Sequence, residues 1–313
     1  HLERPMSEHH AVDQLRDVLT SSVKLRMQSD VPLGAFLSGG VDSSLITALM
    51  QMQSSEPVKT FSIGFPISEY DESEYARRVA RHLGTDHQDF VVTPDAVEIL
   101  PQLAWHFDEP FGDSSAIPTW YLSQMTRRHV SVALTGDGGD ELFAGYTRYR
   151  AVQIASFFDH FPPVKSVLAS SIWQRIPASA RQKSRLRQFK RFSESLAATP
   201  LRRYTDWISI FNETRRGQLY TDQLLGKLRC DPFDFLRTRW NTVIKRDPLT
   251  AVSLTDLTTY LPCDLMTKVD LASMAHSLEC RSPFLDHRLV ELAAAMPAKL
   301  KYRHGRGKRI LQK

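Results

Sequence analysis

Cysteine is scarce in this sequence, and the few cysteines show no pairing pattern. Cys230, Cys263 and Cys280 share no CxxC spacing, and three thiols cannot all pair with one another. A disulfide scaffold and a cysteine zinc site are therefore poor fits, and a reducing compartment is expected. Apolar runs are also short, since none approaches the roughly 20 residues that span a bilayer. The first residues are too polar for a signal peptide. We therefore expect a cytoplasmic protein with no membrane partner.

Several familiar catalytic and nucleotide-binding motifs are missing as well. The chain has neither the Walker A pattern GxxxxGK[ST] nor the dinucleotide pattern GxGxxG. It also lacks the zinc motif HExxH and the nucleophile elbow GxSxG. Ras-like NTPases, Rossmann dehydrogenases, HExxH metalloproteases and α/β hydrolases are therefore not supported.

What the chain has is the size and balance of a globular protein. Its 313 residues are 42% hydrophobic and 24% charged, which suits one large α/β unit or two average domains. The net charge of +5 is compatible with anionic small molecules and with nucleic acid, so it does not separate them. Between His160 and Glu194 the charged residues are all basic. This stretch is either a solvated or docking face or a contact for a polyanion.

Strand and helix signals alternate through the first half of the chain. After an amphipathic helix over 11–26, the predicted strands cover 31–37, 58–65, 87–92 and 130–134, and the predicted helices cover 45–52, 71–83, 97–107 and 117–128. This alternation predicts a parallel sheet with flanking helices, whose ligands bind at the carboxyl ends of the strands. After about Tyr149 the strand signals stop. We therefore predict an α/β nucleotide-binding core over 1–150 and a helical portion over 151–313 that completes the cleft.

The stretch 38–44, SGGVDSS, lies directly between a predicted strand and a predicted helix. Its glycines let backbone N–H groups approach an anion, its serines offer further donors, and the helix N-terminus contributes positive charge. These features predict a phosphate-binding turn. Asp42 would then need a cation between its carboxylate and the phosphate, and Mg²⁺ fits this need. The alternative is a Gly-Ser turn that only caps a helix.

This stretch resembles the pyrophosphate loop of the ATP pyrophosphatases, which cleave ATP between the α and β phosphates and adenylate a substrate. The preceding residues 31–37, VPLGAFL, resemble the synthetase half of the glutamine-hydrolysing asparagine synthetases. The resemblance covers nearly the whole chain and rests on several separated motifs. It implies an adenine nucleotide alpha hydrolase-like fold, with ATP and Mg²⁺ as cofactors.

A second glycine-rich stretch, 135–141 (TGDGGDE), follows the last predicted strand. Asp137 and Asp140 are three residues apart, so both can face one cleft, where they would repel each other unless a cation lies between them. The resemblance implies that Asp140 joins Asp42 on Mg²⁺ and that Asp137 acts on the acyl-adenylate. The other reading is a tight turn with solvated acids. By the same resemblance, the nucleotide is held by Leu37, Ser38, Gly39, Gly40, Asp42, Ser43, Ser44, Ile63, Thr135 and Gly136.

Two further stretches resemble family motifs near the substrate, 108–115 and 264–286. The second is dense in charged residues, which fits either direct catalysis or a structural ion network. Leu271 departs from the family pattern, because members commonly have arginine there. From all these stretches we select Asp137, Glu141 and Lys268 as candidate catalytic residues, and Asp113, Ser114 and Glu279 as candidate substrate contacts.

Two parts of the family's machinery are not found in the sequence. One is the N-terminal glutaminase domain with its leading cysteine, which we expect upstream of His1, as a domain or subunit. The other is a lysine thought to contact the phosphates, beyond the helix that begins near Gly307. Since the sequence stops at Lys313, we expect the isolated chain to bind ATP weakly or to turn over poorly, and Lys308 cannot be assumed to substitute.

The expected function is therefore an ATP-dependent ligase that adenylates the side-chain carboxylate of aspartate and transfers ammonia to give asparagine. Alternatives are an acyl-adenylating relative of the β-lactam synthetase or lasso-peptide cyclase type, a tRNA-modifying relative, and an inactive docking domain. Only the basic stretch supports the tRNA reading, so nucleic acid is not the expected partner.

Overall fold

The computed structural model describes residues 5–66, 71–93, 96–175 and 185–313. The chain forms two compact units, one made of His1–Gly145 and Tyr260–Lys313, the other of Tyr146–Thr259. The division expected from the sequence kept all of 151–313 in a helical portion. Residues 260–313 instead pack with the sheet, because they contribute a fifth strand to it.

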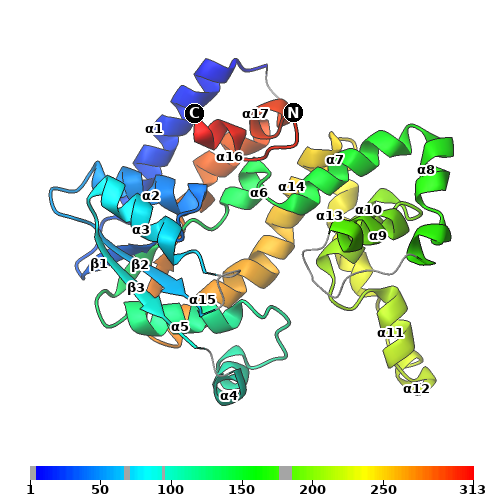
Figure 1. The fold of residues 1–313 in the computed structure, drawn as a ribbon, viewed down its shortest axis with the longest axis horizontal. Helices are drawn as coiled ribbons and strands as arrows, with labels where there is room; N and C mark the ends of the chain where they lie inside the picture. The colour runs from blue at the N-terminus through cyan, green and yellow to red at the C-terminus, as the bar shows by residue number, and fades with distance from the viewer. Residues whose placement is uncertain (1–4, 67–70, 94–95, 176–184) are drawn as a thin grey trace. The chain divides into compact units, whose positions relative to one another are not determined.

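The first unit is built on a five-stranded sheet in the order β3-β2-β1-β4-β5, with every neighbouring pair parallel (Figure 1). The strands are β1 Leu33–Phe36, β2 Lys59–Gly64, β3 Asp86–Val91, β4 Val132–Leu134 and β5 Glu279–Arg281. The predicted parallel α/β sheet is thus confirmed. The fifth strand was missed because three residues that include a glutamate and an arginine carry no apolar run.

Helices cover both faces of this sheet. In Figure 1, α2 and α3 lie on one side of the strands and α5 and α15 on the other. The helices of the unit are α1 Glu8–Arg26, α2 Val41–Gln51, α3 Ser73–Leu83, α4 Ala96–Phe107, α5 Ala116–Thr126, α6 Gly139–Phe143, α15 Thr267–Met274, α16 His287–Ala295 and α17 Ala298–Lys301, with the π-helix η2 Leu261–Met266 and the 3₁₀ helices η3 Pro283–Leu285 and η4 Arg309–Gln312.

The core of this unit follows the alternation of side chains along the strands. Leu37 packs with Ala76 and Ala80 of α3 on one face. Phe61, Val130, Ala133 and Leu278 form a cluster that Phe36 and Leu122 join, and Leu122 belongs to α5. Because successive residues of a strand point to opposite faces, Phe36 and Leu37 serve different clusters. Both faces are therefore buried, as the continuous apolar strands predict.

The order of the strands reverses at β1, which has β2 on one side and β4 on the other. Ala35 of β1 lies opposite Leu134 of β4, so the loops that leave these two strands start side by side. Open parallel sheets bind ligands at such a reversal, beyond the carboxyl ends of the strands. The fold thus brings together the two glycine-rich stretches that the sequence separates by about a hundred residues.

The second unit is helical and is held by a buried carboxylate. Asp256 of α14 accepts hydrogen bonds from Arg148 Nη2 at 3.0 Å and from Tyr149 Oη at 2.6 Å, and Tyr204 of α10 donates to it as well. The helices are α7 Thr147–Asp159, α8 Pro162–Leu168, η1 Ser171–Arg175, α9 Arg185–Ser195, α10 Pro200–Ile208, α11 Glu213–Leu219, α12 Asp222–Leu225, α13 Pro232–Val243 and α14 Pro248–Thr258. Among the helices of the described ranges, none is apolar over a stretch long enough to cross a membrane.

An ion cluster ties α1 to the segment that follows β5. Asp286 caps α16 and accepts hydrogen bonds from Arg288 Nε at 3.0 Å, Arg288 Nη2 at 2.9 Å and Arg26 Nη1 at 3.1 Å. These bonds, those from Arg288 above all, hold the pKa of the nearly buried Asp286 carboxyl well below its usual range. This part of 264–286 therefore forms a structural ion network.

We predict that Asp286→Asn destabilises this unit in a pH-dependent way. Asparagine keeps the helix cap but loses the charge, and the expected cost is about 1–2 kcal/mol near neutral pH. A carboxyl with a lowered folded pKa stabilises above its unfolded pKa, and the gain is lost as the pH falls. The free energy of unfolding should therefore depend less steeply on pH below about 5 in the variant. Equal slopes in wild type, Asp286→Asn and the exposed control Asp17→Asn would contradict this.

Candidate functional site

The first loop leads directly from β1 into α2 and is shaped by a glycine. Gly39 has φ +79°, and a Cβ there would lie 2.6 Å from the backbone of Tyr75. The hydroxyls of Ser38 and Ser43 are 3.0 Å apart, and Ser43 Oγ also accepts the N–H of Ser38 at 3.2 Å. These bonds close the turn, while the first N–H groups of α2 have no helical acceptor. The loop therefore offers backbone donors to an anion.

The second loop runs from β4 into the short helix α6, and its glycines allow it to touch the first. A Cβ on Gly136 would lie 2.9 Å from the backbone nitrogen of Ser43, and one on Gly139 would lie 2.5 Å from Cγ of Asp42. Gly138 has φ +93°, which favours glycine. The GDGGD pattern is thus explained by close contact between two loops.

Asp42 and Asp140 meet at one cation, which comes from a third part of the chain. Lys308 Nζ lies 2.6 Å from Asp42 Oδ2 and 2.8 Å from Asp140 Oδ1. Burial raises the pKa of Asp42 to about 6, although Lys308 acts to lower it. Burial acts to lower the pKa of Lys308, but the two carboxylates raise it above its ordinary value. An ammonium group therefore lies between the two carboxylates that were predicted to share Mg²⁺.

The same carboxylates fit a magnesium ion when a phosphate shares it. The other oxygen of Asp42, Oδ1, is buried without a hydrogen-bond partner, so it is free to coordinate a metal ion. Within the described residues, no group of three or more His, Cys, Asp or Glu could hold a metal. Two carboxylates that converge from two loops, completed by substrate oxygens and water, are a usual magnesium environment.

A cavity of about 330 Å³ lies over these loops. Its walls include residues predicted to bind nucleotide or metal, together with four that were not predicted: Phe36, Val41, Glu72 and Lys308. The predicted lining residues are Ser38, Gly40, Asp42, Ser43, Thr135, Gly136, Asp137 and Asp140. These residues lie in two loops that are far apart in the sequence, and the fold brings them to one cavity.

Asp137 lies at this cavity in an environment that favours its protonated form. Burial raises its pKa, while the hydroxyl of Thr135 and the charge of Lys268 act to lower it. Thr135 is fixed by β5, because its N–H donates to the Arg281 carbonyl at 2.8 Å and its hydroxyl lies 2.9 Å from that of Ser282. A carboxylate whose pKa is raised is better suited to accept a proton.

Lys268 is buried and holds Asp113, which lines a second cavity. Its ammonium donates to Asp113 Oδ2 at 2.8 Å and to Ser115 Oγ at 2.7 Å. Burial would raise the pKa of Asp113, but the hydrogen bonds from Lys268 and Ser115 hold it below its ordinary value. Since Lys268 also acts on the pKa of Asp137, its charge reaches both carboxylates.

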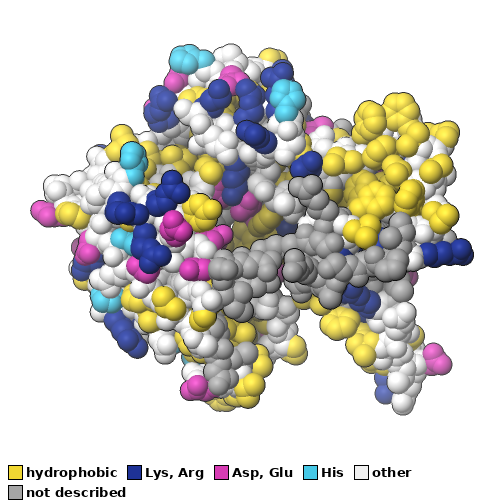
Figure 2. Space-filling view, in the orientation of Figure 1, with side chains coloured by type: hydrophobic (Ala, Val, Ile, Leu, Met, Phe, Trp, Pro, Cys, Tyr) yellow, Lys and Arg dark blue, Asp and Glu magenta, His cyan; other side chains and the backbone are white. Residues whose placement is uncertain are grey.

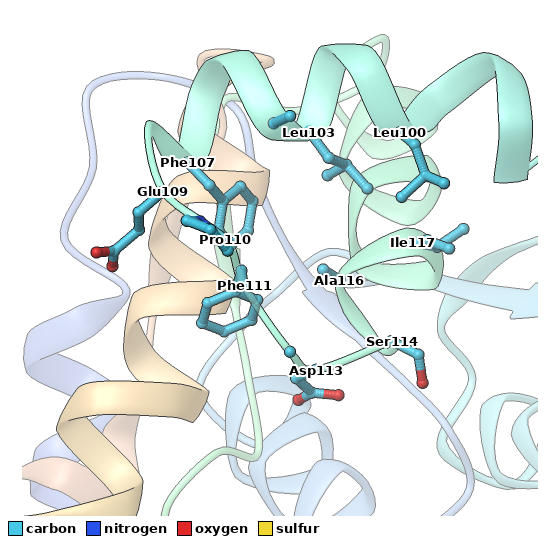
Figure 3. Close-up of a pocket in the computed structure, with 12 residues that line it drawn as sticks. Leu100, Leu103, Phe107, Glu109, Pro110, Phe111, Asp113, Ser114, Ala116 and Ile117 are labelled. Atoms are coloured by element: carbon cyan, nitrogen blue, oxygen red, sulfur yellow. The ribbon is translucent and has the colours of Figure 1, made fainter. Parts of the chain in front are cut away.

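The second cavity, of about 420 Å³, is lined mostly by apolar side chains from α4, the loop after it and the start of α5. Figure 3 shows Leu100 and Leu103 pointing from α4 toward Ile117 of α5, with Asp113 and Ser114 at the far end of the loop. Two of the three predicted substrate contacts, Asp113 and Ser114, therefore line one cavity, with polar groups at one end of an apolar wall.

The remaining predicted residues lie outside these interactions or contribute only backbone. Leu37 is buried in the core, and its N–H donates to the Phe61 carbonyl at 2.8 Å. Ile63 is half-buried on β2, and Glu141 is fully buried in α6. Ser44 Oγ is buried without a hydrogen-bond partner. Glu279 lies at the amino end of β5, opposite Val132, and accepts from Arg281 Nε at 2.6 Å, which gives its substrate role no support.

Lys308 is the residue that the sequence did not allow us to place. Its φ of +54° is unusual for a residue with a side chain, and its N–H donates to the Phe143 carbonyl at 2.7 Å. A Cβ on the preceding Gly307 would overlap the carbonyl of Ala144. The Gly-Lys pair is the sequence feature that could have pointed to Lys308. Its contact with Asp42, 266 positions away, is visible only in the fold.

A parallel sheet with two glycine-rich loops at its reversal point is consistent with an α/β synthetase domain of the pyrophosphate-loop (PP-loop) type. The chain belongs to the asparagine synthase family, because that family's model, Asparagine synthase, matches residues 14–313.

Named relatives agree with this membership. The chain is 33% identical to asparagine synthetase [glutamine-hydrolyzing] 1 of Bacillus subtilis, over 98% of this chain and 47% of that protein. It is also 33% identical to a putative asparagine synthetase [glutamine-hydrolyzing] of Mycobacterium tuberculosis, over 91% of this chain and 42% of that protein. A more distant relative is amidase chyE of Penicillium rubens, which is 29% identical over 95% of this chain and 48% of that protein. The chain spans about half the length of these curated relatives.

We predict that Lys268→Met lowers the free energy of unfolding by about 2–3 kcal/mol, because it leaves the Asp113 carboxylate half-buried without its cation. Adding Asp113→Asn should recover part of that loss. Urea unfolding of both single variants and the double variant gives the coupling between the two residues. Strictly additive losses would show that the 2.8 Å contact contributes nothing.

Proposed function

We propose that this chain is the synthetase part of an ATP-dependent amide ligase. The carboxylate of aspartate would attack the α-phosphorus of ATP, which gives an acyl-adenylate and pyrophosphate. Ammonia would then attack the activated carbonyl and release AMP, which gives asparagine. The observation that carries this proposal is the convergence of Asp42 and Asp140 on one cation beside the glycine-rich turn at the start of α2. Family membership supports the reaction class.

ATP would lie in the 330 Å³ cavity with its β and γ phosphates against residues 38–44. The early N–H groups of α2 and the Ser38 and Ser43 hydroxyls would donate to the phosphate oxygens. Asp42 and Asp140 would hold Mg²⁺, which when bound offsets negative charge on the pyrophosphate. Nucleotide contacts by the backbone of Leu37, Ile63 and Gly136 remain predictions.

The acceptor would enter from the side of Lys268. The second cavity ends at Asp113 and Ser114, and Lys268 places a positive charge close to both Asp113 and Asp137. That charge would attract and orient an acceptor carboxylate. Asp137, whose pKa burial raises, would take the surplus proton when ammonia attacks. For the buried Glu141 we infer a supporting role in α6.

The relatives and the composition support a proposal for the ammonia supply and the location. Relatives named glutamine-hydrolyzing are about twice as long as this chain. A glutaminase domain or subunit is therefore the proposed partner, and the cytoplasm the proposed location.

Another acyl-adenylating reaction would be recognised by the release of pyrophosphate, which larger carboxylic acids would then trigger better than aspartate does.

We predict that Asp42→Asn lowers aspartate-dependent exchange between ATP and pyrophosphate at least about 100-fold, because the metal loses a charged ligand. The measurement is incorporation of labelled pyrophosphate into ATP, with the exposed Asp17→Asn as the matched control. Exchange at the native rate in Asp42→Asn would refute the proposed metal role.

Gly139→Ala should weaken ATP binding about tenfold or more while the fold persists, because the added methyl displaces the Asp42 carboxylate. Titration with ATP and Mg²⁺ by calorimetry measures the change. Gly217→Ala in α11 is the control, since nothing lies within 4 Å of the methyl that it adds. Equal affinities for ATP in the two variants would show that Gly139 does not shape the nucleotide site.

A further inference from the structure

The ammonium of Lys308 occupies the point where the two metal-binding aspartates converge. Asp42 Oδ2 and Asp140 Oδ1 both lie within 3 Å of its nitrogen. A magnesium ion bound to the same two oxygens would need about 2.1 Å to each, in the same space between them. A magnesium ion that binds through Asp42 Oδ2 and Asp140 Oδ1 therefore competes with the ammonium for one position.

The position of Lys308 is built into the backbone around it. The residue adopts φ +54°, and its N–H is tied to the Phe143 carbonyl at 2.7 Å. Side chains on two neighbouring glycines would block it: a Cβ on Gly145 would overlap both Asp140 and the Lys308 side chain, and one on Gly307 would overlap the Ala144 carbonyl. The Lys308 side chain can therefore reach the two aspartates only because positions 145 and 307 have no Cβ.

We propose that Lys308 is a resident counter-ion which keeps free Mg²⁺ out of the nucleotide-free site. This inference rests on the proposed metal role of Asp42 and Asp140. Displacing the ammonium by a metal ion alone would leave a partly buried cation without its acids, which is unfavourable. A triphosphate brings oxygens that can receive the ammonium, so the metal and the nucleotide enter together. Lys308 also keeps the two carboxylates together before the substrate arrives.

The test measures binding of Mn²⁺ alone, as a magnetic stand-in for Mg²⁺, by electron paramagnetic resonance. We expect weak binding to the nucleotide-free wild type and binding about tenfold or more tighter to Lys308→Met, whose paired carboxylates lack a cation. Lys308→Arg keeps the charge and should remain as weak as wild type. Arg306→Met removes an exposed charge from the same segment and should also behave like wild type.

A second readout guards against misfolding of the methionine variant. Mn²⁺ should raise the melting temperature of Lys308→Met and leave that of the wild type unchanged, because a ligand stabilises only the protein that binds it. Adding Asp42→Asn to Lys308→Met should abolish both effects, which assigns them to this site.

The inference is overturned if Lys308→Met binds Mn²⁺ no more tightly than wild type, or if nucleotide-free wild type binds it tightly through Asp42. Exchange between ATP and pyrophosphate in the wild type separates these outcomes from a failure of the proposed function. Normal exchange together with unchanged Mn²⁺ binding in Lys308→Met would refute the counter-ion role alone. Absence of exchange would refute the proposed function.

Discussion

Repulsion between two neighbouring carboxylates, one buried and one partly exposed, is the constraint around which the described site is arranged. Asp42 lies in the first turn of α2 and Asp140 lies in α6, and their like charges repel each other unless a cation lies between them. The chain meets this requirement with Lys308, drawn from its far end. Three segments that are distant in sequence are thus held at one place by charge.

Close packing of backbone makes that arrangement possible. Glycines at positions 136, 139, 145 and 307 stand where a Cβ would meet the partner loop, an aspartate or a carbonyl group. The reversal of strand order at β1 supplies the place, because there the loops that leave β1 and β4 line one cavity. The ion cluster at Asp286 then fixes the segment after β5 against α1, which supports Thr135 through Ser282 and Arg281.

Local pattern was enough to predict the first four strands, the parallel sheet and both glycine-rich loops, since each depends on a short run of residues. The helix predicted over 71–83 is present as α3, although it begins at Ser73, with Glu72 as its N-cap. Long-range features were out of reach. Strand β5 has no apolar run to reveal it, and its pairing with β4 moves 260–313 out of the predicted helical portion.

Contacts between distant parts of the chain limited the site predictions in the same way. Asp42 and Asp140 could be paired from the two loops by resemblance, but Lys308 carries no local signal of its target. Glu279 was chosen for its place in a charged stretch, and the register of β5 sets it at the strand's amino end.

The basic stretch between His160 and Glu194 is described only in part. Lys165 forms an ion pair with Asp159, while Arg181 and Lys183 lie outside the described residues.

The most direct test of the account is a crystal structure of the protein with ATP analogue and Mg²⁺. We expect the triphosphate against residues 38–44 and one metal ion bound by both Asp42 and Asp140, with the Lys308 ammonium moved from between them to phosphate oxygens. A nucleotide bound elsewhere, or a metal ion that touches neither aspartate, would contradict it.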